Sequence, residues 1–292
     1  MRLRSFLFVP GDSERKFAKA SQTKADALIL DLEDSVSGDR AGIARAMVRG
    51  HLDAFPRDGR RQKLWVRVNA LDHPAALADI AAVVGGRPDS ILLPKTRSGA
   101  DVTQLDHYLS ALEQREGVPI GAIQIMPVAT ETPVSMLSFG SYVGCSPRLF
   151  GLTWGAEDLA AALHASTNRL PDGRYEHTYR LARSVCLLGA RAAGVEPIDT
   201  IWSDYRDAAG LAEDAAAARR AGFSGKVSIH PDQVDIINAA FSPSAEEIDH
   251  ARQVVAAFET QGTGTVGLNG KMLDMPHLKQ ARQILALIDA VV

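Results

Sequence analysis

The feature that most constrains the fold of this chain is a regular alternation of short apolar runs with longer amphipathic segments. The apolar runs have the length and composition of buried β-strands. They lie at residues 5–9, 27–31, 64–68, 90–94, 123–128, 149–154, 199–202 and 226–229. Between them, apolar residues recur every three or four positions, which predicts helices. These helices cover about 37–54, 72–84, 98–116, 132–143, 175–193 and 206–221.

About eight strand-helix units in succession indicate a particular fold. Strands that alternate with helices pair in parallel through right-handed crossovers, and eight units are the number that closes a barrel. We therefore expect an α/β fold, a TIM (β/α)8 barrel over residues 1–243, rather than an open doubly wound sheet. A length of 292 residues with 46% hydrophobic content can supply the core of one such domain. In either fold, functional residues are expected at the C-terminal ends of the strands.

The chain continues past the eighth unit with a C-terminal extension, residues 244–292. Two further helices are predicted in it, at 244–259 and 276–292, with the glycine-rich segment 261–270 between them. We expect a helical arm that packs on the barrel or on a neighbouring subunit, with the glycines forming a flexible loop. Gly262–Gly267 matches the dinucleotide fingerprint G-x-G-x-x-G, but it follows a helix and not a strand, which argues against a nicotinamide or flavin site.

Charge and cysteine content argue against several classes of protein. The net charge of -3 argues against a general nucleic-acid surface and leaves room for a local basic patch. Cys145 and Cys186 are too few for a disulfide framework or a zinc cage, so we expect both in the core. The apolar run near the N-terminus is a poor signal peptide, and no stretch approaches the roughly 20 apolar residues of a membrane span. We therefore expect a cytoplasmic enzyme with a small anionic partner, and neither nucleic acid nor a membrane as partner.

Two acidic side chains, Glu131 and Asp158, follow neighbouring predicted strands. Each lies just past the end of an apolar run, and about one strand-helix repeat separates them. Adjacent parallel strands bring such positions together at one edge of the sheet, where two carboxylates suit a hard divalent cation. The alternative is that both are ordinary acids at helix N-termini. The residues alone leave these two interpretations open.

A charged side chain, Arg67, lies inside an otherwise apolar run, and a buried charge must be paired. Its guanidinium suits a substrate carboxylate or a developing oxyanion, and a structural ion pair is the alternative. Asp31, Glu33 and Asp34 lie at the end of the second run, where they could brace Arg67 or orient metal-bound water, or form an acidic loop with a helix cap. Lys95 follows the fourth run and could form a Schiff base with a keto acid. A metal at the carboxylate pair would take over that electrophilic role.

Basic residues cluster after the first predicted strand. Arg15, Lys16 and Lys19 lie in the first turns of the next helix, where they could hold phosphates, although a solvated helix face is the ordinary interpretation. His230 ends the eighth run, a position that favours a substrate contact. The sequence contains no H-E-x-x-H zinc motif, no G-x-S-x-G nucleophile motif and no P-loop.

Eight short motifs follow one another along nearly the whole chain. They are Arg4–Gly11, Leu30–Val36, Arg67–Asn69, Leu93–Lys95, Glu131–Pro133, Gly155–Asp158, Ile229–Pro231 and Gly270–His277. In this order they resemble the citrate lyase β-subunit branch of the HpcH/HpaI aldolase superfamily. Each motif is weak alone, and their succession makes the resemblance specific.

The resemblance implies roles for individual residues. It implies a TIM barrel, usually a homotrimer, that binds Mg²⁺ through Glu131 and Asp158, with Glu131 also next to the substrate. It implies that Arg67 holds a substrate carboxylate or oxyanion. Asp274 would be the catalytic acid/base, delivered by the C-terminal arm of a neighbouring subunit. The arm departs from the commonest form at Asn269, where Asp is frequent, and this affects loop hydrogen bonding more than the chemistry.

Contacts to coenzyme A follow from the same resemblance. The side chains expected to make them are Phe8, Arg15 and Lys19, together with the backbone at Ile229 and His230. Members of the family cleave or form a carbon-carbon bond between an acyl-CoA enolate and a small 2-oxo acid. The resemblance therefore implies a Mg²⁺-dependent lyase for a hydroxyacyl-CoA thioester, such as citramalyl-CoA or malyl-CoA. The alternatives are the β subunit of citrate lyase, acting on a citryl thioester, and a CoA-binding scaffold protein without activity.

Overall fold

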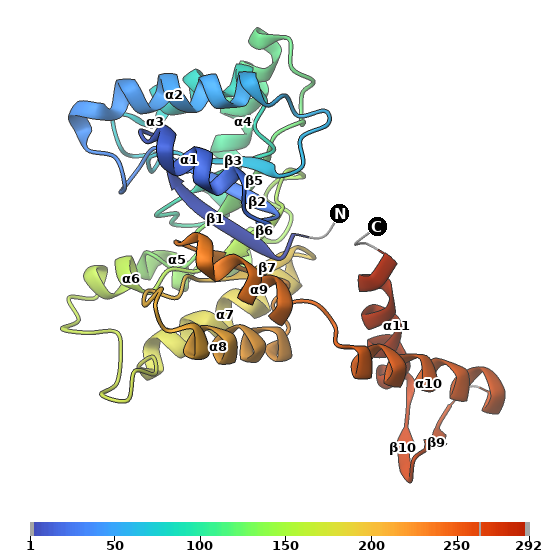
Figure 1. The fold of residues 1–292 in the computed structure, drawn as a ribbon. Helices are drawn as coiled ribbons and strands as arrows, with labels where there is room; N and C mark the ends of the chain where they lie inside the picture. The colour runs from blue at the N-terminus through green and yellow to red at the C-terminus, as the bar shows by residue number, and fades with distance from the viewer. Residues whose placement is uncertain (1–2, 263, 290–292) are drawn as a thin grey trace.

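The computed structural model describes residues 3–262 and 264–289 and contains the expected barrel (Figure 1). Its wall consists of eight parallel strands: β1 Ser5–Pro10, β2 Ala27–Asp31, β3 Lys63–Arg67, β4 Ser90–Leu93, β5 Gln124–Pro127, β6 Gly151–Thr153, β7 Glu196–Asp199 and β8 Gly225–Ser228. Along the sheet they lie in the order β5-β4-β3-β2-β1-β8-β7-β6. The two ends of this order, β5 and β6, meet at isolated bridges that pair Ile125 with Leu149 and Val128 with Thr153. The sheet therefore closes on itself, and the prediction of a TIM barrel is confirmed.

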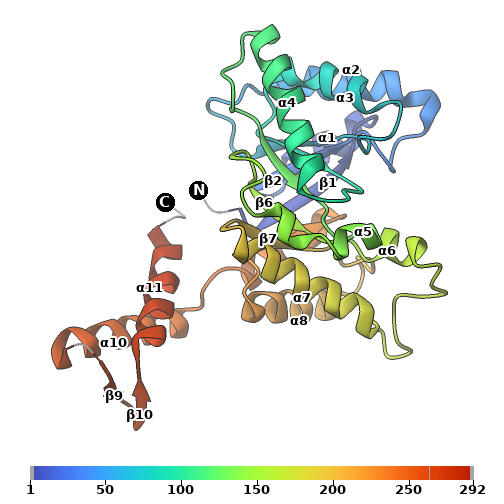
Figure 2. The same cartoon turned by 180° about the vertical axis from the view of Figure 1, so that it is seen from behind.

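Helices surround this wall (Figures 1 and 2). They are α1 Glu14–Ser21, α2 Ala41–Ala54, α3 Ala76–Val83, α4 Gly99–Glu116, α5 Pro133–Met136, α6 Glu157–Ala162, α7 His177–Ala192, α8 Ala208–Ala221 and α9 Val234–Ala240, with 3-10 turns η1 Gly38–Arg40, η2 Val84–Gly86, η3 Phe139–Tyr142 and η4 Pro231–Gln233. Local interactions determine where α4 begins and ends. The Ser98 hydroxyl accepts a hydrogen bond from the Ala100 N–H at its start, and Gly117, with a φ of 69°, ends the helix. Within the residues described, no helix is long and apolar enough to cross a membrane.

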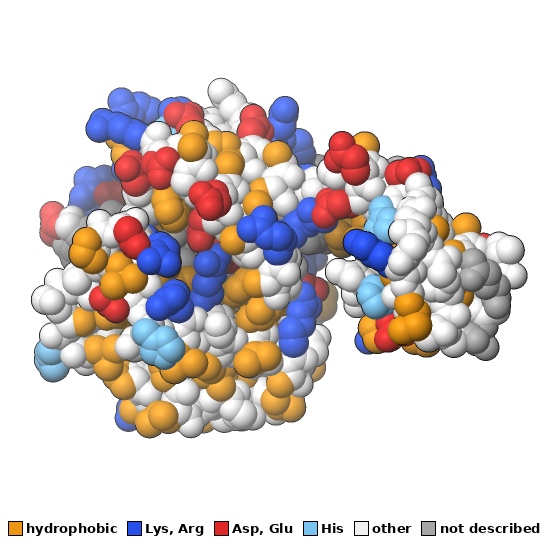
Figure 3. Space-filling view, turned by 90° about the horizontal axis from the view of Figure 1, so that it is seen from below, with side chains coloured by type: hydrophobic (Ala, Val, Ile, Leu, Met, Phe, Trp, Pro, Cys, Tyr) orange, Lys and Arg blue, Asp and Glu red, His pale blue; other side chains and the backbone are white. Residues whose placement is uncertain are grey.

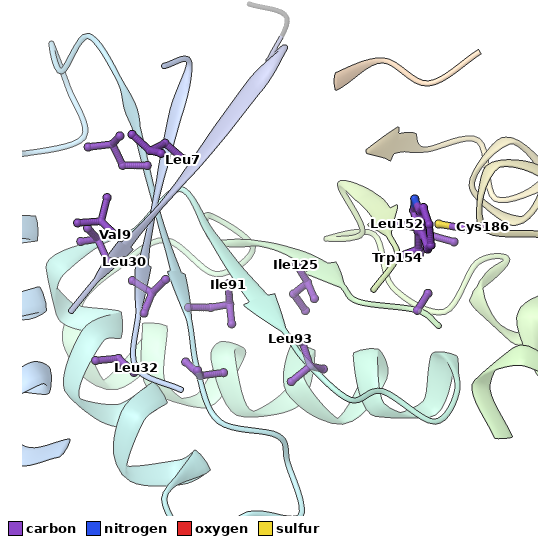
Figure 4. Close-up of a cluster of buried hydrophobic side chains, with 14 of the residues drawn as sticks. Leu7, Val9, Leu30, Leu32, Ile91, Leu93, Ile125, Leu152, Trp154 and Cys186 are labelled. Carbon is purple, nitrogen blue, oxygen red and sulfur yellow. The ribbon is translucent and has the colours of Figure 1, made fainter. Parts of the chain in front are cut away.

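The barrel has an inner and an outer core. Inside the barrel, the ring of Trp65 packs edge-on against Phe6 and Phe150, with ring centroids 5.0 Å apart in both pairs. Successive side chains of a strand point to opposite faces, so Leu7 and Val9 belong to the outer core beneath the helices (Figure 4). The same alternation decides which side chains at the strand ends point into the barrel mouth.

The cysteines behave as predicted. Cys186 is buried in the outer core and Cys145 is half-buried against it. Both are free thiols.

Two local predictions are wrong. The seventh strand lies at 196–199 and not at 199–202. The prediction missed its start because Glu196 and Pro197 are not typical of a buried strand. The helix expected at 132–143 consists of the short α5 and η3, separated by non-helical backbone at Ser138.

The C-terminal arm has a small core of its own. Its helices α10 Ala245–Gln261 and α11 Met275–Asp289 pack together, and buried side chains such as Val254 and Leu278 lie between them. The arm leaves the barrel on the side where β1 begins (Figures 1 and 2) and forms a separate lobe beside it (Figure 3).

The glycine-rich segment of the arm is not the flexible loop that we expected. Val266–Leu268 and Lys271–Leu273 pair as the antiparallel strands β9 and β10. Asn269 and Gly270 make the turn with φ values of 51° and 76°. An Asn-Gly pair adopts this conformation at little cost, which explains why Asn at 269 is compatible with the hairpin.

A buried ion network joins β7 and β8 to the helices outside them. The ammonium of Lys226 is fully buried and lies 2.7 Å from carboxylate oxygens of both Asp199 and Asp214. Asp199 also accepts hydrogen bonds from Arg183 and from the indole N–H of Trp154. Its pKa would be raised by burial, but the charges of Lys226 and Arg183 hold it below the ordinary value.

Replacing Lys226 by Met is expected to lower the free energy of unfolding by about 3–5 kcal/mol, because it removes a charge partner from the fully buried carboxylate of Asp199. Urea denaturation would measure the change. Lys24→Met, at an exposed lysine, is the matched control and should stay within about 0.5 kcal/mol of wild type. Equal urea midpoints for Lys226→Met and Lys24→Met would show that the ion network does not stabilise the fold.

Candidate active site

A cavity of about 910 Å³ opens at the C-terminal ends of the barrel strands, the end where barrel enzymes bind their ligands. We call it the strand-end cavity. The predicted site residues that line it are Phe8, Arg15, Lys19, Arg67, Glu131, Asp158, Ile229 and His230. The structure thus brings together every predicted site residue except Asp274.

Arg67 ends β3 and is held by the acidic turn that follows β2. Its Nε and Nη2 donate to the two carboxylate oxygens of Asp31 at 2.7 and 2.8 Å, and its Nη1 lies 2.9 Å from Glu33 Oε2. The guanidinium carbon lies 4.7 Å from the centroid of the Phe8 ring. Burial alone would raise the pKa of Asp31, but the hydrogen bonds and charge of Arg67 hold it below its ordinary value. Arg67 therefore makes the structural ion pair and also presents a fixed cation to the cavity.

Glu131 follows β5 and is only 6% exposed. Its Oε2 accepts a hydrogen bond of 2.5 Å from the backbone N–H of Lys95. Burial, reinforced by the negative charge of Asp158, raises the pKa of Glu131 to about 8. Asp158 lies in the first turn of α6 and is partly exposed. Two carboxylates that disfavour each other's charge form an arrangement that a bound cation would stabilise.

Lys95 lies two residues past the end of β4 and has a left-handed backbone conformation, with a φ of 52°. This conformation is uncommon outside glycine and is concentrated at functional sites. Its ammonium pairs with Glu33 and lies 3.3 Å from Asp34 Oδ1 and 3.7 Å from Asp158 Oδ1. Burial alone would lower the pKa of Lys95, but Glu33 and the neighbouring carboxylates raise it above the ordinary value. A Schiff base needs a neutral amine, so these contacts argue against that role.

The set of donors fits a hard divalent cation. Five carboxylates at the strand ends face two cationic side chains, Arg67 and Lys95. Gly155 keeps space open beside Glu131, because a Cβ there would lie 3.1 Å from the Glu131 Cγ and Oε1 atoms. Among residues 3–262 and 264–289, no cluster of three or more His, Cys, Asp or Glu could hold a metal. The protein would thus supply two carboxylate ligands, and substrate and water would fill the remaining coordination positions of the ion, as is usual for Mg²⁺.

A buried network of hydroxyl groups fixes the turn that carries Glu131, and our sequence interpretation missed it. The Tyr142 hydroxyl lies 2.9 Å from Thr96 Oγ1 and 2.8 Å from Ser135 Oγ. Thr96 Oγ1 also donates to the carbonyl of Val128 at 2.9 Å. The network ties the turn after β4 to the turn after β5. Its members lie in separate segments, so only their contacts in the fold reveal it.

Basic and aromatic side chains border the mouth of the cavity. Arg15, Lys16 and Lys19 of α1 all line it. His230 stacks on Tyr205, with ring centroids 4.7 Å apart and an interplanar angle of 24°. Tyr205 does not itself line the cavity and contacts it through His230. It was not among the predicted residues, since it lies in a loop without a recognisable motif.

Asp274 lies in the arm, between β10 and α11. No described residue of the arm lines the strand-end cavity. Figures 1 and 2 show the arm and α6, the helix that carries Asp158, on opposite sides of the barrel. Within one chain, Asp274 is therefore remote from the residues of the cavity.

Two family models match the chain. The model described as HpcH/HpaI aldolase/citrate lyase matches residues 4–231. A second model, described as a C-C bond lyase of the TIM-barrel fold, matches residues 173–290.

Characterised relatives match over almost the full length. Citrate lyase subunit beta of Escherichia coli (strain K12) is 38% identical over 286 residues, which span 97% of this chain and 92% of the relative. A (3S)-malyl-CoA thioesterase of Cereibacter sphaeroides (strain ATCC 17025 / ATH 2.4.3) is 36% identical, covering 99% of this chain and 95% of the relative.

A solved structure shows the same relationship. The crystal structure of CitE from Mycobacterium tuberculosis in complex with magnesium, acetoacetate and coenzyme A superposes with a TM-score of 0.82. The two chains are 33% identical, and the match covers 98% of each. The expectation drawn from the eight motifs is confirmed: the chain belongs to the HpcH/HpaI aldolase/citrate lyase family.

Proposed function

We propose that this chain is a carbon-carbon lyase that splits a hydroxyacyl-CoA thioester into an acyl-CoA and a 2-oxo acid, or forms it from them. The observation that carries the proposal is the strand-end cavity, in which a carboxylate pair, a fixed guanidinium and a basic helix lie together. Citramalyl-CoA and malyl-CoA are the substrates that we favour. The malyl-CoA thioesterase among the relatives supports this substrate class.

We assign the binding of Mg²⁺ to Glu131 and Asp158. The fit rests on the pairing of the buried Glu131 with the partly exposed Asp158 and on the space beside Gly155. When bound, Mg²⁺ would polarise the oxygens of the 2-oxo acid and stabilise the charge that develops on them. Glu131 must be ionised to bind, and with a pKa of about 8 it would release its proton at that step. The magnesium in the Mycobacterium tuberculosis relative supports the choice of cation.

Arg67 and Asp274 have separate tasks in this proposal. Arg67 balances the negative charge on the 2-oxo acid, and its pairing with Asp31 keeps the guanidinium in one orientation. Asp274 protonates the carbon of the thioester enolate during cleavage, or removes a proton from that carbon during synthesis. A thioester makes this step accessible because its α-carbon is far more acidic than that of a free carboxylate.

The coenzyme A portion would bind at the mouth of the cavity. Arg15 and Lys19 offer cations to its phosphates, and Phe8, which packs on the guanidinium of Arg67, lines the same cavity. The backbone at Ile229 and His230 borders the same mouth. The coenzyme A in the complex of the Mycobacterium tuberculosis relative supports this assignment.

Because Asp274 is remote from its own cavity, we propose that each arm completes the site of a neighbouring subunit in a homotrimer. Met272 and Met275, which flank Asp274, are exposed in the single chain. Burial of their side chains against a second copy would stabilise that contact.

A second candidate function is that of the β subunit of citrate lyase, acting on a citryl thioester. The Escherichia coli relative of that name, at 38% identity, favours it. A scaffold without activity is disfavoured, because Arg67, Glu131, Asp158 and Asp274 are all present.

A lyase assay across citramalyl-, malyl-, methylmalyl- and citryl-CoA, with Mg²⁺ and with EDTA, tests the proposal. We expect Mg²⁺-dependent release of a 2-oxo acid, with citramalyl- or malyl-CoA cleaved faster than citryl-CoA. A preference for citryl-CoA would favour the citrate lyase candidate. No cleavage of any thioester would contradict both.

A further inference from the structure

Beside Asp274, the arm carries a second titratable side chain, His277, to which the proposed reaction gives no role. The His277 Nδ1 lies 2.5 Å from Asp274 Oδ1 and 3.2 Å from the backbone nitrogen of Asp274. The backbone N–H of His277 donates to the Asp274 carbonyl at 3.0 Å. Both residues are therefore held in place at the start of α11.

A separation of 2.5 Å between a carboxylate oxygen and an imidazole nitrogen requires a proton between the two atoms. If the proton belongs to His277 Nδ1, the imidazole donates to the carboxylate. If it belongs to the Asp274 carboxyl, Nδ1 accepts, and the backbone N–H of Asp274 approaches the same nitrogen. The proton can therefore change owner without movement of the heavy atoms.

The acid/base role of Asp274 creates a need for such a transfer. In every turnover, its carboxyl group gives up or gains one proton and must then be returned to its starting protonation state. An arm that docks over a cavity excludes water from the residue that enters the site. In the single chain, the side chains of Asp274 and His277 are 51% and 49% exposed. Docking of the arm would cover Asp274. His277 lies three residues further along the helix and can stay in contact with solvent.

We propose that His277 relays the proton between Asp274 and water. In cleavage, Nδ1–H gives its proton to Asp274 Oδ1 while Nε2 takes one from water, and the carboxylic acid then protonates the enolate carbon. In synthesis, Asp274 takes the proton from the α-carbon and passes it to Nδ1, and Nε2 releases one to water. Each transfer leaves the imidazole in the other tautomer, and exchange of its ring protons with water restores the starting tautomer before the next turnover. His277 acts through Asp274 and does not touch the substrate. This inference rests on the proposed function.

Steady-state kinetics of the full-length enzyme with Mg²⁺ and its best thioester test the relay. His277→Asn keeps a side-chain oxygen that can accept the Asp274 N–H, but this oxygen cannot carry a proton. We expect kcat to fall about 10- to 100-fold with KM unchanged. Free imidazole should restore much of the kcat of His277→Ala. His250→Asn, at an exposed histidine of α10, is the matched control and should behave as wild type.

Two results would overturn the relay. One is a wild-type kcat in His277→Asn. The other is a loss in His277→Ala that imidazole does not restore, together with a raised KM or a lowered melting temperature, which would mean that the imidazole only caps α11. Failure of the proposed function is distinguishable from both, because the wild-type enzyme itself would then cleave no thioester.

Discussion

Replacing Glu131 by Gln is expected to remove Mg²⁺-dependent turnover and, at the same time, to stabilise the metal-free protein at alkaline pH. Turnover should fall about 1,000-fold or more, because the amide cannot supply the anionic oxygen that holds the cation. Isothermal titration should show Mg²⁺ binding lost or weakened to the same degree. Asp158→Asn should also lose turnover. Normal activity in either variant would contradict the metal assignment.

The stability effect follows from the pKa of Glu131. Burial and the charge of Asp158 raise it from 4.5 to about 8 in the folded chain, so between these values the folded state keeps a proton that the unfolded state has lost. Stability of the wild type therefore falls as pH rises from about 4.5 to 8, by an amount on the order of 5 kcal/mol in the metal-free protein. The amide introduced by Glu131→Gln does not titrate, so the variant escapes this loss.

Thermal denaturation in EDTA at pH 5.5 and pH 9 would measure the difference. We expect the melting temperature of Glu131→Gln, relative to wild type, to rise by about 5 °C or more between the two pH values. Glu116→Gln, at an exposed glutamate of α4, controls for the general effect of removing a carboxylate. If the melting temperatures of the wild type and Glu131→Gln changed with pH in parallel, the pKa of Glu131 would not be raised by burial.

Replacing Asp274 by Ala is expected to lower kcat by at least about 100-fold while leaving the affinity for a CoA thioester within a few-fold of wild type. The residue lies outside the strand-end cavity of its own chain, so the barrel and its binding groups stay intact. Kinetics and calorimetric titration of acetyl-CoA would separate the two effects. An unchanged kcat would remove Asp274 from the mechanism.

Mixed assemblies test where the arm acts. Asp274→Ala and Glu131→Ala subunits should each be inactive alone, because one lacks the proposed acid/base and the other the proposed metal ligand. We consider that each arm completes the cavity of a neighbouring subunit. Co-expression of the two variants in equal amounts then produces about a quarter of the sites with both an intact Glu131 and an intact Asp274. Recovery of activity near that fraction supports exchange of arms between subunits. No recovery would mean that each chain completes its own site.

The sequence was sufficient to predict the barrel and most of the site for a physical reason. Parallel strands of a barrel end on the same side, so Arg67, Glu131 and Asp158 had to converge once the strand ends were correctly placed. The seventh strand was misplaced because Pro197 and Glu196 interrupt its apolar pattern. Periodicity reports burial, and a strand with polar ends gives little of that signal.

What the sequence could not supply are contacts between segments that no spacing rule connects. The hydroxyls of Thr96, Ser135 and Tyr142 meet only because two strand-end turns approach the same η3 segment. The contact of Asp274 with His277 depends on the backbone geometry at the start of α11. Sequence spacing alone would give an ordinary helix-capping pair there.

The closure of the barrel has a mechanical consequence for the site. Seven of the strand-to-strand contacts follow continuous ladders of two to five paired residues, and β5 and β6 meet only at two isolated bridges within the described residues. Glu131 follows β5 and Asp158 follows β6, so the two carboxylates flank the seam that closes the wall. Backbone hydrogen bonds cross this seam from the Phe150 N–H to the Ile125 carbonyl and from the Ala129 N–H to the Thr153 carbonyl. In the proposed function, a cation held by Glu131 and Asp158 would therefore link the two ends of the strand order across the join that closes the barrel.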